Sequence, residues 1–293
     1  EESISKLLNK NQKALLDVRD EHGNLPLIHA IIARQFTIVG LLLVAQANPN
    51  LANGDGRNAL VTAIQEGSKE SISLLLMHGA DTNLLDKNEE RTPLAIVAEQ
   101  GDHKLIRQLI SYHASVDSQL GVVGRSPLYI AASKGHDQAV KILIKHGASV
   151  NTLAKSTFQA PLHAAVSSGN IECVKTLLES KADVGITTPQ NRTPLHLAIG
   201  HTKFEEISKI LIANNANINC GDEEENTPLH LACEYNYFDT ARVLLSHNPP
   251  ASVCIKNDKG LQPIHYAAKK GNEEILTLLV KSNADIHAID NEG

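Results

Sequence analysis

Three groups of residues in this sequence are of types that can do chemistry. The segment Gly54-Asp55-Gly56-Arg57-Asn58-Ala59 fits G-x-G-x-x-A, the glycine pattern with which dinucleotide-binding domains hold a pyrophosphate. Imidazole is a common zinc ligand, and four histidines recur at one position of a repeating pattern, namely His163, His196, His230 and His265. The thiols that could serve as nucleophiles belong to Cys173, Cys220, Cys233 and Cys254.

The sequence around the glycine pattern argues against a cofactor site. A dinucleotide fingerprint follows a buried strand and needs an acidic residue about 20 positions later. Here Asn48-Pro49-Asn50 comes before the glycines, and these residues do not form a strand. We therefore interpret the glycines as turn residues and expect no cofactor.

The histidines and cysteines also favour structural roles. Stacked helical layers lie roughly 8–10 Å apart, whereas zinc holds its nitrogens at about 2.0–2.1 Å, so histidines of adjacent units cannot share an ion. We expect each imidazole to hydrogen-bond the backbone that links two units. The four cysteines have no paired short spacing and no basic cluster beside them. This predicts reduced thiols, with neither a metal site nor a catalytic nucleophile.

The elements that carry these residues repeat along the chain. Each unit begins with a triplet whose second residue is Pro, or Ala in one unit, and these second residues are 33, 34, 34, 34, 33, 34 and 35 positions apart. A small apolar residue follows four positions later. Such a fixed period is typical of a solenoid of stacked units. The triplets are Leu25-Pro26-Leu27, Asn58-Ala59-Leu60, Thr92-Pro93-Leu94, Ser126-Pro127-Leu128, Ala160-Pro161-Leu162, Thr193-Pro194-Leu195, Thr227-Pro228-Leu229 and Gln262-Pro263-Ile264.

The repeat resembles the ankyrin repeat. Thr193-Pro194-Leu195-His196-Leu197-Ala198 and Thr227-Pro228-Leu229-His230-Leu231-Ala232 match its T-P-L-H-x-A motif in full. The resemblance implies an all-α fold, an ankyrin-repeat solenoid of stacked helix-turn-helix units with short β-hairpin-like fingers. It implies eight repeats over residues 20–287 as one solenoid domain. Residues 1–19 would be the second helix of a preceding repeat or an N-terminal cap, and residues 288–293 the start of a further, truncated repeat. We expect a piece of a longer protein.

One fingertip position departs from the repeat. It is glycine at Gly23, Gly56, Gly124 and Gly260, but the other four units have Glu90, Phe158, Asn191 and Glu225. Glycine adopts a positive φ at little cost, and Phe and Glu do not. The sequence therefore predicts a different turn at the fingertips that lack glycine. Residues 200–206 also hold one extra residue between the two helices of their unit.

Composition narrows the class of protein further. The net charge of −6 argues against a general nucleic-acid binder, which would need a basic surface. Apolar runs such as Leu74-Leu75-Leu76-Met77 are too short to span a bilayer, and Glu1-Glu2-Ser3 does not begin a signal peptide. We expect a monomeric, cytoplasmic protein without membrane insertion.

The family implies protein binding on a concave surface of fingertips and first helices. Four arginines directly follow the fingertip position and form a ladder with a gap at Gln159. They suggest an extended partner segment with spaced acidic groups, for which Val122, Val123 and Phe158 would provide an apolar anchor. The alternative is that the arginines pair with Glu66, Glu90 or Glu99 on neighbouring units, as solvated surface ion pairs. The predicted partner-binding residues are Arg57, Arg91, Arg125, Arg192, Val122, Val123, Phe158, Glu99, Glu223, Glu224 and Tyr235.

Two questions stay open at this point. The array could be a protein–protein interaction scaffold in its own right. It could instead be the targeting or substrate-docking part of a larger enzyme, or of an effector delivered to a host cytosol, with the catalytic domain outside this segment. In neither case do we expect the array itself to be an enzyme. The finger asparagines Asn50, Asn83, Asn151 and Asn219 resemble the sites of asparaginyl hydroxylation in ankyrin proteins, although asparagine also simply suits a turn.

Overall fold

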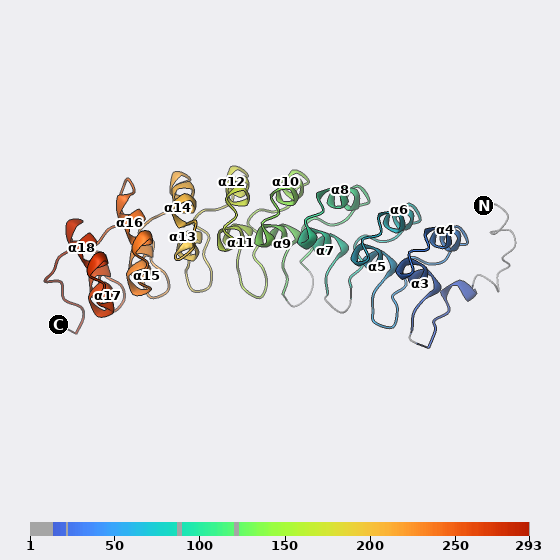
Figure 1. Ribbon diagram of the computed structural model, residues 1–293, viewed down its shortest axis with the longest axis horizontal. Coiled ribbons are helices and arrows are strands. Elements are labelled where there is room, and N and C mark those ends of the chain that lie inside the picture. The colour runs from blue at the N-terminus through green and yellow to red at the C-terminus, as the bar shows by residue number, and fades with distance from the viewer. Residues whose placement is uncertain (1–13, 22, 87–89, 120–122, 293) are drawn as a thin grey trace. The chain divides into compact units, whose positions relative to one another are not determined.

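The regular elements of this protein are short α-helices that follow one another in pairs (Figure 1). The structure is a computed structural model that describes residues 14–21, 23–86, 90–119 and 123–292. A 3-10 helix, η1 (Ala14–Asp17), comes before the first pair. The pairs are α3 (Pro26–Ile32) and α4 (Phe36–Val44), α5 (Ala59–Gln65) and α6 (Lys69–Met77), α7 (Pro93–Gln100) and α8 (His103–Ser111), α9 (Pro127–Lys134) and α10 (Asp137–Lys145), α11 (Pro161–Ser167) and α12 (Ile171–Glu179), α13 (Pro194–Ala198) and α14 (Phe204–Ala213), α15 (Pro228–Glu234) and α16 (Phe238–Ser246), and α17 (Pro263–Lys270) and α18 (Glu273–Lys281).

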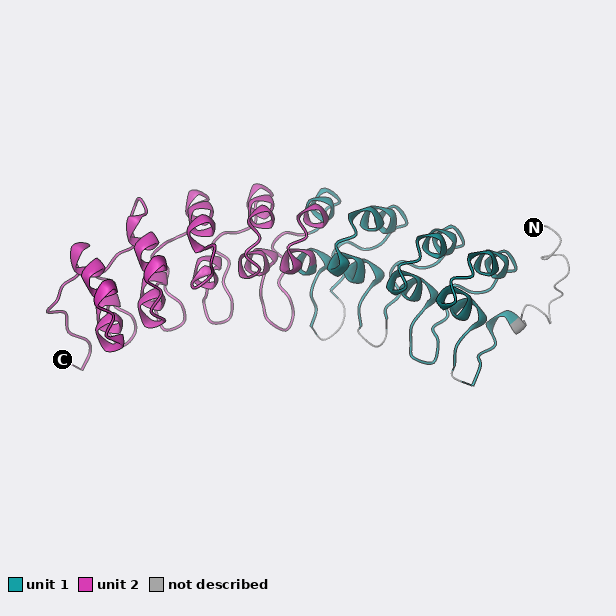
Figure 2. Cartoon of the chain, in the orientation of Figure 1, with its two compact units in different colours: residues 1–130, 141–148 teal, residues 131–140, 149–293 magenta. Residues whose placement is uncertain are grey.

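The chain divides into two compact units (Figure 2). Unit 1 comprises residues 1–130 and 141–148 and contains the helices from α3 to α8. Unit 2 comprises residues 131–140 and 149–293 and contains the helices from α11 to α18. Within each unit, first helices pack on neighbouring first helices and second helices on neighbouring second helices. The helix-turn-helix pair is therefore the repeating element of both units.

Local sequence explains where the first helices begin and end. In α7, Thr92 is the N-cap and its Oγ1 accepts a hydrogen bond from the Ala95 N–H at 3.2 Å. Pro93 occupies the first helical position, where a missing N–H costs nothing. The helix ends at Gly101, whose φ of 75° lets its N–H bond the Val97 carbonyl. A glycine suits this left-handed cap because it has no Cβ to clash with the backbone.

The core is built from the repeated triplet. Its third residue is buried in every unit, as is the small residue that comes three positions later. Small side chains at this second position let adjacent helices approach closely, so that mainly aliphatic side chains fill the core, with a few aromatic rings such as Phe204 and Tyr129. The first set is Leu27, Leu60, Leu94, Leu128, Leu162, Leu195, Leu229 and Ile264, and the second is Ala30, Ala63, Val97, Ala131, Ala165, Ala198, Ala232 and Ala267.

The prediction of a different turn at the fingertips that lack glycine is wrong. Glu90, Phe158, Asn191 and Glu225 have φ angles of 51°, 52°, 55° and 59°, in the same left-handed region as the fingertip glycines. Backbone hydrogen bonds across the finger hold the fingertip residue in this conformation, whatever its side chain is. In the Glu225 finger, for example, the Glu225 N–H bonds the Asp222 carbonyl at 2.9 Å, and the Asp222 N–H bonds the Asn226 carbonyl at 3.0 Å. These hydrogen bonds outweigh the cost of a left-handed backbone conformation at a residue with a side chain, which is about 1–2 kcal/mol.

Where the structure describes them, the fingers are narrow loops without extended strands. In the described part of the chain, strand-like pairing is limited to two isolated bridges, Ala52–Asn58 and Asp86–Arg91. Neighbouring fingertips are joined by the backbone, since the Glu223 N–H bonds the Gln190 carbonyl at 2.9 Å. Over the same described residues, none of the helices has the length and apolar character needed to cross a bilayer.

Candidate functional site

The four repeated histidines connect each repeat to the next, as predicted. In His230, Nδ1 accepts a hydrogen bond from the Thr227 N–H at 3.1 Å. Because Nδ1 is the acceptor, the proton resides on Nε2, which donates to the Leu261 carbonyl of the following repeat at 3.0 Å. His196 makes the same two bonds, to the Thr193 N–H and the Asn226 carbonyl.

The histidine bonds continue at both ends of this series. His163 Nε2 donates to the Arg192 carbonyl at 3.3 Å, and His265 Nε2 donates to the Ala288 carbonyl at 3.0 Å. Both nitrogens of each ring are therefore used by the backbone. The described residues also contain no cluster of three or more side chains suited to hold a metal ion.

Burial favours the neutral form of three of these imidazoles, those of His163, His196 and His230. It lowers the pKa of His230 to about 4 and lowers the pKa values of His163 and His196 in the same direction, although the carbonyl acceptors act the other way. A neutral ring is required for the observed geometry, since Nδ1 must keep a lone pair for the backbone N–H. The shifts thus belong to structural groups rather than to a general acid or base.

The glycine pattern lies in a finger, and two of the four cysteines lie in the core. Gly54 lies in a finger, where its N–H bonds the Gly23 carbonyl at 2.8 Å. Cys173 and Cys233 are buried, and burial raises the pKa of the Cys233 thiol to about 12. Burial also raises the pKa of Cys220. The thiolate, the form that attacks electrophiles, is thus disfavoured at Cys220 and Cys233.

The predicted arginine ladder is engaged by the protein's own side chains. Arg91 forms an ion pair with Glu99 on α7 of the same repeat, whereas the alternative interpretation placed such pairs between neighbouring repeats. Arg125 lies over the Tyr129 ring with its guanidinium carbon 5.3 Å from the centroid. These contacts hold two guanidinium groups beside the first helices of unit 1.

The other two arginines are partly buried. In unit 2, the Arg192 Nε lies 3.7 Å from Oδ2 of Asp222, a carboxylate whose side chain is only 5% exposed. Arg57 has a buried Nε with no hydrogen-bond partner in the structure. The four ladder positions therefore differ in their surroundings, although they share one place in the sequence of the repeat.

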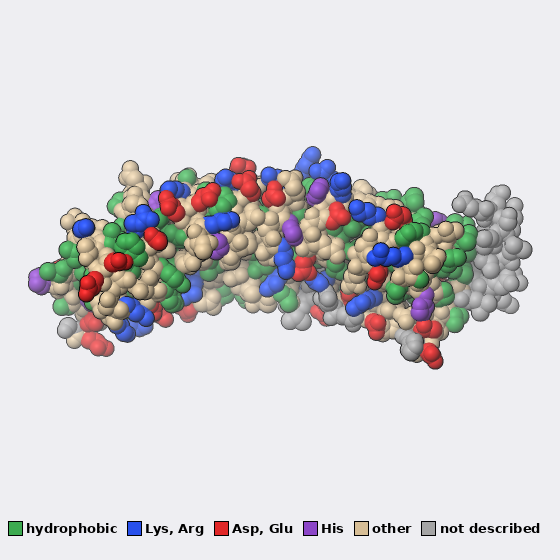
Figure 3. Space-filling view, in the orientation of Figure 1, with side chains coloured by type: hydrophobic (Ala, Val, Ile, Leu, Met, Phe, Trp, Pro, Cys, Tyr) green, Lys and Arg blue, Asp and Glu red, His purple; other side chains and the backbone are tan. Residues whose placement is uncertain are grey.

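The predicted apolar and acidic contact residues are mostly at the surface. Val122 lies outside the described residues. Val123 in unit 1 is 47% exposed, and in unit 2 Phe158 and Tyr235 are each 52% exposed. Glu223 and Glu224 are exposed on one fingertip of unit 2, where Glu224 pairs with Lys259 at 3.4 Å. Over the face seen in Figure 3, acidic and basic side chains are interspersed rather than segregated.

The finger asparagines bridge neighbouring repeats. The Asn83 Nδ2 donates to the His113 carbonyl at 3.1 Å, and its Oδ1 accepts from the Ser115 N–H at 2.8 Å. Asn50 makes the equivalent bonds to Gly79 and Asp81. Asn151 and Asn219 each accept an N–H from the next repeat. These hydrogen bonds give the asparagines a structural role between repeats, in addition to the preference of asparagine for turns.

Sequence reasoning missed one feature of the surface, a hollow between two inter-helix turns of unit 2. Gly200, Phe204, Tyr237 and Arg242 are among its lining residues. The available signal was the extra residue within 200–206, which indicated an altered turn but not its shape.

Comparison with known proteins agrees with the geometry. The sequence profile described as ankyrin repeats (3 copies) matches residues 1–86, 60–154, 153–222 and 202–290. Among solved structures, the human ASB11 ankyrin repeat domain matches with a TM-score of 0.60 and 31% identity, covering 69% of this chain and 89% of that one.

Curated relatives match over shorter segments. An ankyrin repeat protein of fowlpox virus is 36% identical over 76 residues, which are 25% of this chain and 10% of the relative. The NF-kappa-B p105 subunit of Gallus gallus is 34% identical over 76 residues, 26% of this chain and 8% of the relative. The matched segment thus spans about a tenth of each curated relative.

Ankyrin repeats are generally non-catalytic modules that bind other proteins, and no enzyme family is indicated for this sequence. The profile matches run through nearly the whole chain, and the histidine-linked helix pairs are the structural form of the motif that it describes. This chain belongs to the ankyrin repeat family.

Proposed function

We propose that the fingertips and first helices form the surface on which this protein binds a partner protein. The observation that carries the proposal is Phe158. Its aromatic side chain is 52% exposed at a fingertip, on a backbone with a φ of 52°. A bulky residue in this conformation is strained, and exposed strained residues are concentrated at binding sites. Neither exposure nor strain benefits the folded chain, so a contact with a partner gives the residue a role.

The arginines specify the chemistry of the partner. Arg57, Arg91 and Arg125 follow the fingertips of three successive repeats in unit 1. Stacked layers roughly 10 Å apart match about every third residue of an extended strand, which rises about 3.3 Å per residue. The partner segment is therefore extended and carries carboxylates at that spacing. The Arg91–Glu99 pair is partly exposed and of the kind worth under about 1 kcal/mol, so a partner carboxylate can replace it at little cost.

The experiment compares charge reversal on this surface with charge reversal elsewhere. The double variant Arg91→Glu plus Arg125→Glu should lose binding to a fluorescein-labelled peptide with glutamate at every third position, measured by fluorescence anisotropy. The matched control, Lys104→Glu plus Arg107→Glu, makes the same charge change at exposed positions of α8 and should retain binding. Retention by the fingertip variant, with the fold intact by circular dichroism, would refute the acidic-partner proposal.

The anchor is tested separately in pull-downs from cell lysate. Phe158→Ala should weaken capture of the partners of the parent protein, because it removes an exposed aromatic group without opening a core cavity. If both this variant and the arginine double variant retain every partner, the fingertip surface is not the binding site.

The wider setting of the array is part of the same proposal. Residues 20–287 act as one solenoid domain, monomeric and cytoplasmic, and the four free cysteines agree with a reducing compartment. The curated relatives are about ten times longer than their matched segments, which supports the alternative that such an array docks targets for a larger enzyme or effector. The complete open reading frame distinguishes these two cases.

A further inference from the structure

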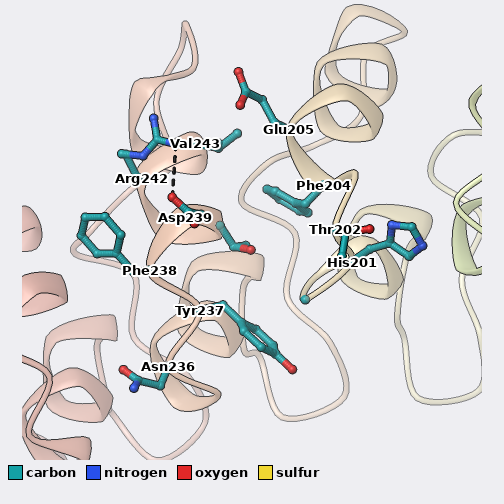
Figure 4. Close-up of a pocket in the computed structure, with 12 residues that line it drawn as sticks. His201, Thr202, Phe204, Glu205, Asn236, Tyr237, Phe238, Asp239, Arg242 and Val243 are labelled. Carbon is teal, nitrogen blue, oxygen red and sulfur yellow. Dashed lines mark hydrogen bonds and ion pairs between the residues drawn. The ribbon is translucent and has the colours of Figure 1, made fainter.

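A hollow of about 620 Å³ lies between the inter-helix turns of two consecutive repeats of unit 2 (Figure 4). Its deepest side chains are apolar or small, since Phe204, Val243 and Thr240 are only 3%, 4% and 5% exposed. Charged and polar groups surround them, with Glu205 on α14 facing Asp239 and Arg242 on α16 across the opening (Figure 4). No residue that lines the hollow comes from a finger. It is therefore a separate feature from the proposed fingertip surface.

The sequence of this turn creates the hollow. Helix α13 has only five residues, whereas α11 and α15 each have seven, so the turn after α13 begins early. Gly200 takes a φ of 80° in that turn, and a Cβ placed there would lie 2.7 Å from the Tyr237 ring. Tyr237 thus packs against Gly200 so closely that a larger residue there would have to displace the ring. This close fit holds the wall of the hollow in place.

A second hollow of about 390 Å³ adjoins the first through Phe238, which lines both. The second is lined by residues of α18, including Leu278 and Thr277. We call the two neighbouring hollows together the groove; its α18 side extends along the whole helix, from Glu273 to Lys281. Each volume lies within the range of ligand pockets, about 300–1,000 Å³.

The charges of the groove favour a basic occupant. Its lining carries four carboxylates, Glu205, Asp239, Glu273 and Glu274, but only two cations, Arg242 and Lys281. All four carboxylates lie in the first turn of a helix, where the helix dipole favours a negative charge.

The existing ion pairs leave these carboxylates accessible. The Lys209 ammonium, 2.6 Å from Glu205, lowers the pKa of that carboxyl, so it stays ionised. Asp239 is paired with Arg242 at 3.3 Å, and its side chain is 86% exposed. Such exposed pairs are worth under about 1 kcal/mol and yield readily to a cation from a partner.

An exposed aromatic ring also lines the first hollow. This is Tyr237, which is 41% exposed. Aromatic faces attract cations and also cover aliphatic chains. Arginine and lysine have both parts, an apolar stem and a charged end.

We infer that this groove docks a short segment of a partner protein in which arginine or lysine alternates with large apolar residues. The apolar groups lie against Phe204 and Phe238, and the cations reach the carboxylates of the rim. This interaction is independent of the fingertip surface and requires a partner of opposite charge to the one proposed there.

The test uses a short fluorescein-labelled peptide of alternating leucine and arginine, and the same peptide with glutamate in place of arginine. The arginine peptide should bind saturably by fluorescence anisotropy, and the glutamate peptide should not. Two variants should each weaken binding at least about tenfold. Asp239→Lys reverses a rim charge, and Thr202→Trp fills the hollow from an exposed position.

The control is Glu172→Lys on α12. Glu172 has the same i,i+3 ion pair, with Lys175, in the first turn of a second helix, but it lines neither hollow. Equal loss of binding in this control would mean non-specific attraction and would overturn the inference. Full binding by the Thr202→Trp variant would overturn it as well. The Arg91→Glu plus Arg125→Glu variant should bind the arginine peptide normally, which separates failure here from failure of the fingertip proposal.

Discussion

Acid should weaken this protein through its buried histidines, and His230 gives the clearest case. The ring is fully buried, accepts from the Thr227 N–H and donates to the Leu261 carbonyl. Protonation of Nδ1 removes the first bond and places a charge in the core. The pKa is 6.5 in the unfolded chain and about 4 in the folded one. The stabilising contribution is therefore complete above pH 6.5 and is lost as the pH falls from 6.5 toward 4.

The size of the effect follows from this gap. A difference of about 2.5 pKa units corresponds to about 3 kcal/mol when the loss is complete, and to about 2 kcal/mol near pH 5. This is a large part of the stability of an ordinary domain, which is about 5–15 kcal/mol. His163 and His196 shift in the same direction and add to the loss.

Urea unfolding near pH 7.5 and near pH 5 isolates the contribution of one ring. The His230→Gln variant should be less stable than the parent near neutral pH, because its amide replaces the two ring bonds imperfectly. Its unfolding free energy should then fall about 2 kcal/mol less than that of the parent between the two pH values. Exposed His78 provides the control, and His78→Gln should show the pH dependence of the parent.

The test is how steeply the unfolding free energy changes with pH in the parent and in each variant. Carboxylates elsewhere contribute equally to the pH dependence of the parent and of both variants, so their contribution cancels when the variants are compared with the parent. If His230→Gln loses as much stability as the parent between pH 7.5 and 5, the ring does not couple folding to protonation and the reasoning is refuted.

Three further substitutions test individual features. Gly200→Ala places a Cβ against the Tyr237 ring and should cost about 1–3 kcal/mol, clearly more than Gly67→Ala, which has a similar φ but open space around it; equal thermal shifts would contradict the packing argument. Phe158→Gly should raise the unfolding free energy by up to about 1 kcal/mol, since relief of left-handed strain exceeds the added backbone entropy, and a loss of stability in urea would show that the ring packs usefully. Asn83→Ala should cost about 1–2 kcal/mol by removing two bonds between repeats, and unchanged hydrogen exchange at Ser115 would argue against that bridge.

The architecture could be predicted from the sequence because every repeat carries a similar pattern of residues with the same local structural role. The Thr-Pro start, the left-handed glycine caps and the histidine links depend on contacts within one repeat or between neighbours. Eight copies made these rules visible. The fingertip at Phe158 was predicted wrongly because local preference alone was considered, whereas hydrogen bonds across the finger fix its backbone.

The candidate sites were harder to predict because they depend on side-chain placement. The shared sequence position of Arg91, Arg125 and Arg192 gave no sign that one would meet Glu99, another Tyr129 and the third Asp222. The groove near Gly200 was hidden for a similar reason. A one-residue insertion is visible in the sequence, but the shortened α13 and the position of Tyr237 emerge only in three dimensions.

The histidine hydrogen bonds between repeats of unit 2 all point in the same direction along the chain. Each Nε2 donates forward, from His163, His196, His230 and His265 to carbonyls 29, 30, 31 and 23 residues later. A repeat that loses its C-terminal neighbour is left with an imidazole N–H that has no acceptor, whereas a repeat that loses its N-terminal neighbour is left with a backbone carbonyl that has no donor. The two faces that a repeat of unit 2 presents to its neighbours are therefore chemically different, one a side-chain donor and the other a main-chain acceptor.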